Sequence, residues 1–300
     1  MDLAHFGLTR RPFRATPDTE SFYATPTHEA AVDGLKAAFA ARDGLALIDG
    51  QPGSGKTLAA LKFLESLGND VPRVLIPAPR FARPAEFFQA ILFDLGVEYR
   101  GLSDNELRLA VTDHLLGNLV EGHPTVLVVD ESQHLNAEML EEIRLFGNLE
   151  SRSAKAVLVV LIALPPLRER LAKPEFAAFS QRIAFRAHIE PLDRVEAARY
   201  LWHHLQVAGG KPSQLITEDA INLLTAQCQG LPRLLNQAAF LAFTLAGSAG
   251  ESVVDTEAVL EALSRLGLQA EDEELDEPLI MPKPIEPSIA KPKPTRRRAA

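Results

Sequence analysis

Apolar residues follow two patterns along the first 190 residues, and each pattern predicts one kind of secondary structure. Short, continuously apolar runs predict buried strands, and apolar residues at every third or fourth position predict helices between them. The predicted strands are 45–49, 73–77, 125–130, 156–164 and 183–189, and the predicted helices are 29–42, 57–67, 84–95, 103–120 and 137–147. Apolar strands that alternate with helices indicate an α/β fold with a parallel sheet covered on both faces.

Beyond residue 191 only the helical spacing of apolar residues remains, and it predicts helices at 194–207, 218–229, 232–247 and 256–266. We therefore predict three parts: an α/β core over 1–190, a small all-helical domain over 191–268 and a tail over 269–300. The core begins with an irregular segment, 1–28, whose aromatic residues predict that it packs on something. The tail is acidic, then proline-rich, then basic, a composition that predicts disorder.

Composition narrows the class of protein. The chain has 300 residues, a net charge of −9 and a single cysteine, Cys228, so an internal disulfide is excluded. The negative charge argues mildly against DNA binding through a broad basic face, although a local basic patch stays open. Neither a membrane-spanning apolar run nor a signal-peptide core is found, and we expect a cytoplasmic protein with no membrane span.

One short stretch of the sequence predicts a phosphate-containing ligand. Residues 50–57 fit the pattern G-x-x-x-x-G-K-[ST], the phosphate-binding P-loop or Walker A motif, placed between a predicted strand and a predicted helix. Its glycines let backbone N–H groups turn toward phosphate oxygens, Lys56 can reach the β- and γ-phosphates, and the Thr57 hydroxyl can hold Mg²⁺. The predicted ATP-binding residues are Gly50, Gln51, Pro52, Gly53, Ser54, Gly55, Lys56, Thr57 and Leu58.

A second motif supplies carboxylates. The predicted strand 125–130 ends in Asp130, and Glu131 follows it. In an open α/β sheet, ligands bind at the carboxyl ends of the strands, so Asp130 would join the Mg²⁺ shell, the Walker B role, and Glu131 would act as the base that activates water. Many strands end in acids at a turn, but joined to the P-loop the pair predicts Mg²⁺-dependent ATP hydrolysis.

From these residues onward the chain resembles the AAA+ ATPases. Within them it is most similar to the ExeA (general secretion pathway A) group, which resembles the transposition ATPases of the TniB type. The resemblance covers about residues 1–268. The motifs that carry it lie at 6–8, 12–13, 16–18, 50–57, 130–135, 148–150, 165, 167–168, 181–183, 190–192 and 230–233.

The resemblance implies roles for two arginines and a homo-oligomeric state, a ring or a filament. Arg182 matches the arginine finger, which reaches the γ-phosphate of a neighbouring subunit, and Arg233 matches the sensor-2 position, which contacts the nucleotide from the helical lid. Without the resemblance, Arg182 reads as a surface charge or salt bridge. Arg233 reads as an exposed arginine in the first turn of a helix, where a cation is slightly unfavourable.

The chain departs from the family at one position. The family has Gly-Gln-Pro-Glu-Leu after the fourth strand, and this chain has Ala-Leu-Pro-Pro-Leu at 163–167. Leu164 therefore replaces the polar sensor-1 residue that positions water near the γ-phosphate. We expect nucleotide binding to survive and hydrolysis or its coupling to motion to suffer, with Asn148 as a candidate substitute.

The leading hypothesis is an oligomeric ATPase that drives the assembly or remodelling of a partner complex, which the sequence does not name. One alternative is a DNA-binding ATPase that selects targets in transposition. The other is a nucleotide-binding switch with very low hydrolysis, because of Leu164.

Overall fold

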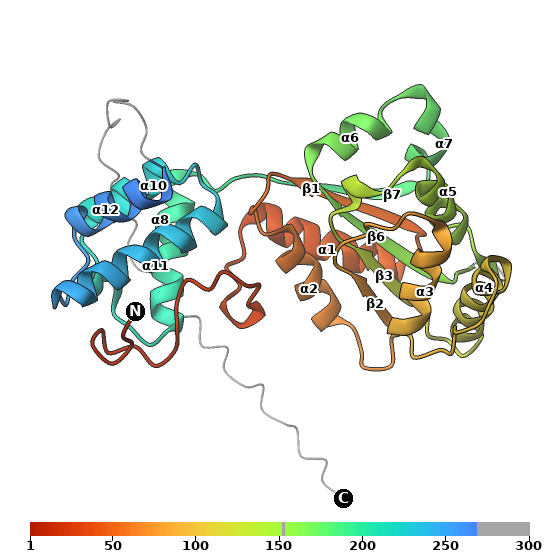
Figure 1. The fold of residues 1–300 in the computed structure, drawn as a ribbon, viewed down its shortest axis with the longest axis horizontal. Helices are drawn as coiled ribbons and strands as arrows, with labels where there is room; N and C mark the ends of the chain where they lie inside the picture. Colours follow the sequence, from red (N-terminus) through yellow and green to blue (C-terminus); the bar gives the residue numbers. More distant parts are fainter. Residues whose placement is uncertain (152–153, 269–300) are drawn as a thin grey trace, which may run out of the picture.

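The computed structural model describes residues 1–151 and 154–268. It has an α/β part and a helical part, joined by the chain that leaves the last strand of the sheet (Figure 1). The predicted α/β fold class, with a parallel sheet followed by helices, is confirmed.

The sheet contains five parallel strands in the order β2-β3-β6-β1-β7. Their bounds are β1 (Leu45–Gly50), β2 (Arg73–Ile76), β3 (Thr125–Val129), β6 (Val157–Ala163) and β7 (Ile183–Ile189), each close to the predicted range. Because the strands are parallel, the carboxyl ends of β1 and β3 lie at one edge of the sheet. The two motifs that follow these strands therefore meet there.

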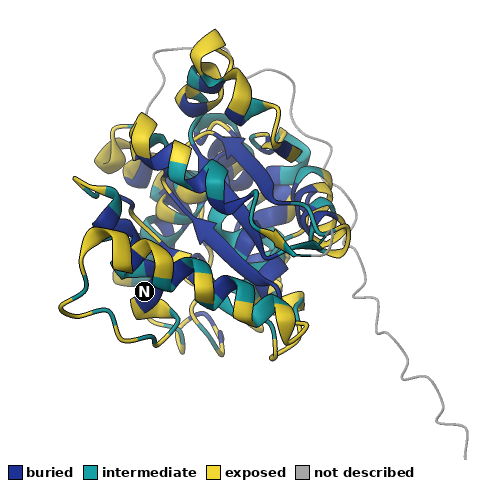
Figure 2. Ribbon diagram, turned by 90° about the vertical axis from the view of Figure 1, so that its right-hand side faces the viewer, coloured by how far each residue is buried: buried dark blue, intermediate teal, exposed yellow. Residues whose placement is uncertain are grey.

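Helices cover both faces of the sheet (Figure 2). Strand residues alternate between the faces, as a pleated strand requires. Ile48 and Val128 pack in one cluster with helices α1 (Pro26–Ala40) and α2 (Lys56–Ser66). Leu47 and Leu127 pack in another with α3 (Pro84–Asp94), α4 (Asp104–Val120) and α5 (Ala137–Phe146).

The helical part has its own core, which includes Leu201, Leu224 and Phe243. Its helices are α8 (Arg194–Val207), α9 (Pro212–Leu215), α10 (Glu218–Gln227), α11 (Pro232–Ala249) and α12 (Thr256–Leu266). Local sequence fixes where they begin: Asp193 and Glu196 form a capping box at α8. We call this part the lid.

The N-terminal residues pack on the lid, although they precede the sheet in the chain. Phe6, Leu8 and Phe13 are buried in the same core as the lid helices. The prediction that this segment packs on something is confirmed, and we call residues 6–23 the strap because they link the lid core to α1. The three sequence ranges given above for the parts of the chain stay a prediction.

Several short elements were not predicted. In α6 (Pro165–Leu171) and η3 (Pro174–Phe176) the first turn contains proline, which resembles a turn signal, and the others are only two to four residues long. A proline is tolerated at that position, where its missing N–H has no intrahelical partner. These elements are the 3-10 helices η1 (Thr19–Ser21), η2 (Ser132–His134) and η3 (Pro174–Phe176), the helices α6 (Pro165–Leu171) and α7 (Ala177–Ser180), and the hairpin β4 (Glu150–Ser151) with β5 (Ala154–Lys155).

The predicted disordered tail, 269–300, lies outside the described residues. Among residues 1–151 and 154–268, no helix combines the length and the apolar composition that a membrane span requires.

Candidate nucleotide site

The P-loop curls at the carboxyl end of β1 and leads directly into α2. Gly53 and Gly55 have φ angles of 80° and 96°, in the left-handed region that favours glycine. The Lys56 ammonium donates hydrogen bonds to the carbonyl oxygens of Gly50 and Gln51, at 3.0 and 2.7 Å. The lysine therefore lies across the loop, with its charge held against backbone oxygens.

Burial lowers the pKa of Lys56, because a desolvated ammonium is disfavoured. The carboxylates of Asp130 and Glu131 oppose this shift, and the charge of Arg233 adds to it. A phosphate anion placed here would favour the charged ammonium. The electrostatics thus fit an anionic ligand.

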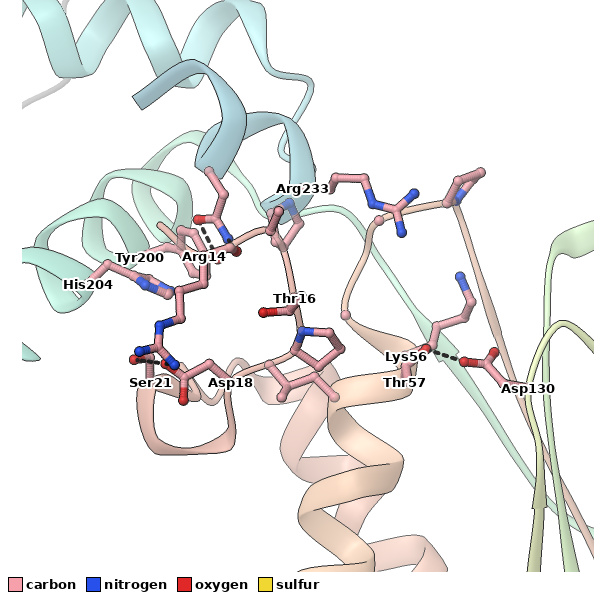
Figure 3. A pocket seen from close by; sticks show the side chains of 18 of the residues that line it. Arg14, Thr16, Asp18, Ser21, Lys56, Thr57, Asp130, Tyr200, His204 and Arg233 are labelled. Carbon is pink, nitrogen blue, oxygen red and sulfur yellow. Dashed lines mark hydrogen bonds and ion pairs between the residues drawn. The ribbon is translucent and has the colours of Figure 1, made fainter. Parts of the chain in front are cut away.

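Thr57 and Asp130 meet across the site, although 73 residues separate them. The Thr57 hydroxyl donates to the Asp130 carboxylate, with 2.5 Å between the oxygens (Figure 3). Burial raises the pKa of Asp130, and the Thr57 hydrogen bond and the Lys56 charge oppose this rise. Hydroxyl and carboxylate oxygens are ligands that suit Mg²⁺, so this pair fits the predicted metal site.

Glu131 borders the same cleft from the turn that follows β3. Its φ of 52° is left-handed, and its backbone N–H donates to the Asp130 carboxylate at 2.7 Å. Its side chain is exposed and accepts a hydrogen bond from the Gln133 amide. The two acids therefore face different surroundings: Asp130 is buried beside Thr57, and Glu131 can reach solvent.

Arg233 reaches the cleft from the lid, in the first turn of α11 (Figure 3). Its backbone N–H donates to the carbonyl oxygen of Gly53 at 3.2 Å. A Cβ on Gly53 would lie 2.7 Å from the Cβ of Arg233, so this approach requires glycine in the P-loop. The lid thus contacts the loop directly.

The strap forms a wall of the cleft that the sequence analysis did not assign to the site. Arg14, Thr16 and Asp18 line the cleft together with Tyr200 and Asn236 of the lid (Figure 3). The Asn236 amide accepts from the Tyr200 hydroxyl and donates to the Arg14 carbonyl oxygen, both at 2.9 Å. The Thr-Pro-Asp motif at 16–18 was the available signal.

His28 was also missed, and nothing in its local sequence marks it. From α1 its Nε2–H donates to the carbonyl oxygen of Ser54 at 3.0 Å, and its Nδ1 contacts the Thr25 hydroxyl at 2.6 Å. Burial lowers the pKa of His28. The neutral ring therefore supports the P-loop backbone through its hydrogen bond to Ser54.

Arg182 is not brought to this cleft. It precedes β7, whose first residue pairs with Leu45 at the start of β1, whereas Gly50 pairs with Ile189 at the other end. The 7 residues of β7 span about 20 Å at roughly 3.3 Å per residue. Arg182 is exposed. The hydrogen bond and charge of Lys155 lower the pKa of Glu150, and the charge of Arg182 adds a smaller contribution.

Leu164 lines the cleft as the sensor-1 assignment requires, and its side chain offers no hydrogen bond there. The candidate substitute Asn148 does not lie nearby. It follows Gly147, which contacts Gly44 and Leu45 at the amino end of β1, the edge opposite the P-loop. The prediction that Asn148 could replace the sensor-1 residue is therefore wrong.

Comparison with known proteins agrees with this geometry. Residues 40–171 match a family model described as an AAA domain. The chain therefore contains an AAA domain. This AAA+ protein is similar to general secretion pathway protein A of Aeromonas hydrophila, at 33% identity over 234 residues, which are 77% of this chain and 42% of the relative.

It is also similar to the ATP-dependent target DNA activator B of Escherichia phage Mu, at 29% identity over 217 residues, which are 70% of this chain and 63% of the relative. The chain therefore spans less than two thirds of the length of either relative. The resemblance to both the ExeA and the transposition ATPases is confirmed at the level of sequence similarity.

Solved AAA+ structures share the fold. The Cdc6p protein of Pyrobaculum aerophilum aligns with a TM-score of 0.68 at 17% identity, over 88% of this chain and 71% of that chain. The ORC2 protein of Aeropyrum pernix, solved as ADPNP-ADP complexes, aligns with a TM-score of 0.64 at 19% identity, over 81% of this chain and 69% of that chain.

Proposed function

We propose that this AAA+ protein binds Mg²⁺–ATP in the cleft between sheet and lid and hydrolyses it to ADP and phosphate as a homo-oligomer. The observation that carries the proposal is the meeting of Lys56, Thr57, Asp130 and Glu131 at one edge of the sheet. Residues of a P-loop and of a Walker B strand are thereby combined in one cleft, as phosphoryl transfer to water requires.

Each of these residues has a task. The Lys56 ammonium and the Arg233 guanidinium offset the charge of the β- and γ-phosphates, and Glu131 orients water and accepts its proton. Thr57 and Asp130 would hold Mg²⁺, which neutralises charge on the phosphate oxygens when bound. The strap and Tyr200 form the wall beyond the P-loop, and we assign the base and ribose to that side.

The similarity to the relatives supports proposals for the process that hydrolysis serves. We propose that ATP turnover drives the assembly or remodelling of a partner complex, as the similarity to general secretion pathway protein A suggests. We propose a cytoplasmic location for this work. A second candidate is DNA-dependent target selection in transposition, favoured by the similarity to the phage Mu activator. A third, a nucleotide switch with very low turnover, is favoured by Leu164.

Turnover of the full chain, measured with Mg²⁺–ATP with and without double-stranded DNA, separates the three candidates. Stimulation by DNA, with ATP-dependent filaments on it, supports target selection. Turnover indifferent to DNA supports remodelling of a protein complex, and ATP binding with no turnover in either condition supports the switch.

Glu131→Gln is the matched variant, since an amide fills the same space and cannot act as a base. It should bind ATP like the parent, lose at least about a hundredfold in turnover and accumulate the ATP-bound oligomer. If its turnover stays within about twofold of the parent, Glu131 is not the base.

A further inference from the structure

We infer that Gln133 is the positioning residue for Glu131 and supplies the amide that the end of β6 lacks at Leu164. The inference rests on the proposed hydrolysis and goes beyond it, because it assigns a second element, η2, to the orientation of the base. Gln133 lies two residues after Glu131, in the turn that carries the chain away from β3.

The Gln133 amide makes two hydrogen bonds that point in opposite directions. Its Nε2 donates to the Glu131 carboxylate, and its Oε1 accepts from the backbone N–H of Leu164 at 3.2 Å. One side chain therefore joins the proposed base to the carboxyl end of β6.

Chemistry fixes the orientation of this amide. A carboxylate can only accept, and a backbone N–H can only donate, so nitrogen must face Glu131 and oxygen must face Leu164. A flipped amide would place its oxygen against the Glu131 carboxylate and its NH₂ group against the Leu164 N–H, and neither pair can form a hydrogen bond. The bridge has one arrangement, and a residue that only donates or only accepts cannot replace it.

The turn that presents Gln133 is itself anchored. Ser132 is fully buried, and its hydroxyl donates to the carbonyl oxygen of Val129 at 2.6 Å. The backbone N–H of Leu135 donates to the Ser132 carbonyl oxygen at 3.1 Å, which closes the single turn of η2. Gln133 thus projects from a fixed backbone toward both of its partners.

Glu131 needs such a partner. Its side chain is exposed, and an exposed glutamate samples many rotamers. Only a fraction of the molecules would then hold the carboxylate in the orientation that a general base requires. Leu164, at the sensor-1 position, lines the same cleft and has no polar atom in its side chain. Gln133 places an amide between these two residues, with one hydrogen bond to each.

The test compares steady-state turnover and ATP-analogue affinity of the parent, Gln133→Met and Leu164→Gln. Methionine keeps the length of the side chain and removes both hydrogen bonds. We expect Gln133→Met to lower kcat by about tenfold to a hundredfold, part of what a general base contributes, with analogue affinity within about twofold. Gln206→Met, an exposed glutamine of the lid, is the matched control and should leave both unchanged.

Rescue separates positioning from simple structural support. Adding Leu164→Gln to Gln133→Met returns an amide to the end of β6, so kcat should recover by about threefold or more, whereas Leu164→Gln alone should change the parent less. If kcat of Gln133→Met equals that of the parent, or if kcat and affinity fall together with a lower melting temperature, the inference is overturned.

A crystallographic readout covers the case in which the parent shows no turnover, an outcome that refutes the proposed hydrolysis alone. In structures of the parent and Gln133→Met, the Glu131 carboxylate should leave its position only in the variant. A carboxylate that keeps the same position without the amide overturns the inference, whatever the rate.

Discussion

Removing the charge of Arg182 is the sharpest test of whether this AAA+ protein works across a subunit boundary. Arg182 lies at the amino end of β7, and the P-loop begins at the carboxyl end of β1. The two positions are about 20 Å apart along the sheet, because β7 is 7 residues long. One arginine side chain cannot span that separation within a subunit.

The expected loss follows from this geometry. If Arg182 offsets charge on the γ-phosphate of a neighbouring subunit, Arg182→Ala should lower turnover by on the order of a thousandfold, as arginine fingers do elsewhere. That factor corresponds to about 4 kcal/mol of transition-state stabilisation. ATP affinity should change little, because the P-loop contacts of the mutated subunit remain in place.

Mixed oligomers provide the assay. Lys56→Ala subunits keep Arg182 and cannot bind nucleotide, so they should restore part of the turnover when they assemble with Arg182→Ala subunits. Total phosphate release is measured across mixing ratios and should pass through a maximum, since each active interface needs one subunit of each kind.

Two outcomes would refute this reasoning. Turnover of Arg182→Ala close to that of the parent would show that the charge is not used. A flat mixing curve, with both proteins folded and co-assembled, would show that Arg182 acts on its own chain, for instance on Glu150 of the hairpin.

Two further predictions concern binding and stability. Lys56→Ala should abolish binding of a fluorescent ATP analogue, because the ammonium that crosses the P-loop is lost, and unchanged affinity would contradict the site. Burial lowers the pKa of His204 to about 3, so between pH 6.5 and 3 only the unfolded chain takes up this proton and stability falls as pH falls. The contribution from pH 7 to pH 5 is about 2 kcal/mol, and urea unfolding of His204→Gln should show a correspondingly smaller loss.

The secondary structure of the sheet and the lid could be predicted because each buried strand is a continuous apolar run and each helix carries an apolar stripe. The short elements between β6 and β7 could not, since Pro165 and Pro166 resemble a turn and only tertiary contacts decide otherwise. His204 illustrates a second limit. Phe13 of the strap stacks on His204 and the residue is buried, a contact between distant segments that nothing in the local sequence marks.

Some residues of the candidate site could likewise be predicted from the sequence, and others could not. Contiguous motifs identified Lys56, Thr57, Asp130 and Glu131, because their roles require fixed spacing in the chain. The brace by His28 and the bridge by Gln133 depend on which helix or turn packs beside the motif, information that spacing does not hold. A family pattern located Leu164, yet only the structure identified the amide beside it.

The contact between the lid and the P-loop does not depend on the charge that the lid brings to the nucleotide. The hydrogen bond from Arg233 to Gly53 uses backbone atoms, so any replacement of the Arg233 side chain except proline keeps the bond and removes the guanidinium. The charge at the nucleotide can therefore be changed while the contact between lid and P-loop is kept. The reverse is not possible at Gly53, because a Cβ there would meet Arg233 and would also strain a P-loop residue whose φ is 80°.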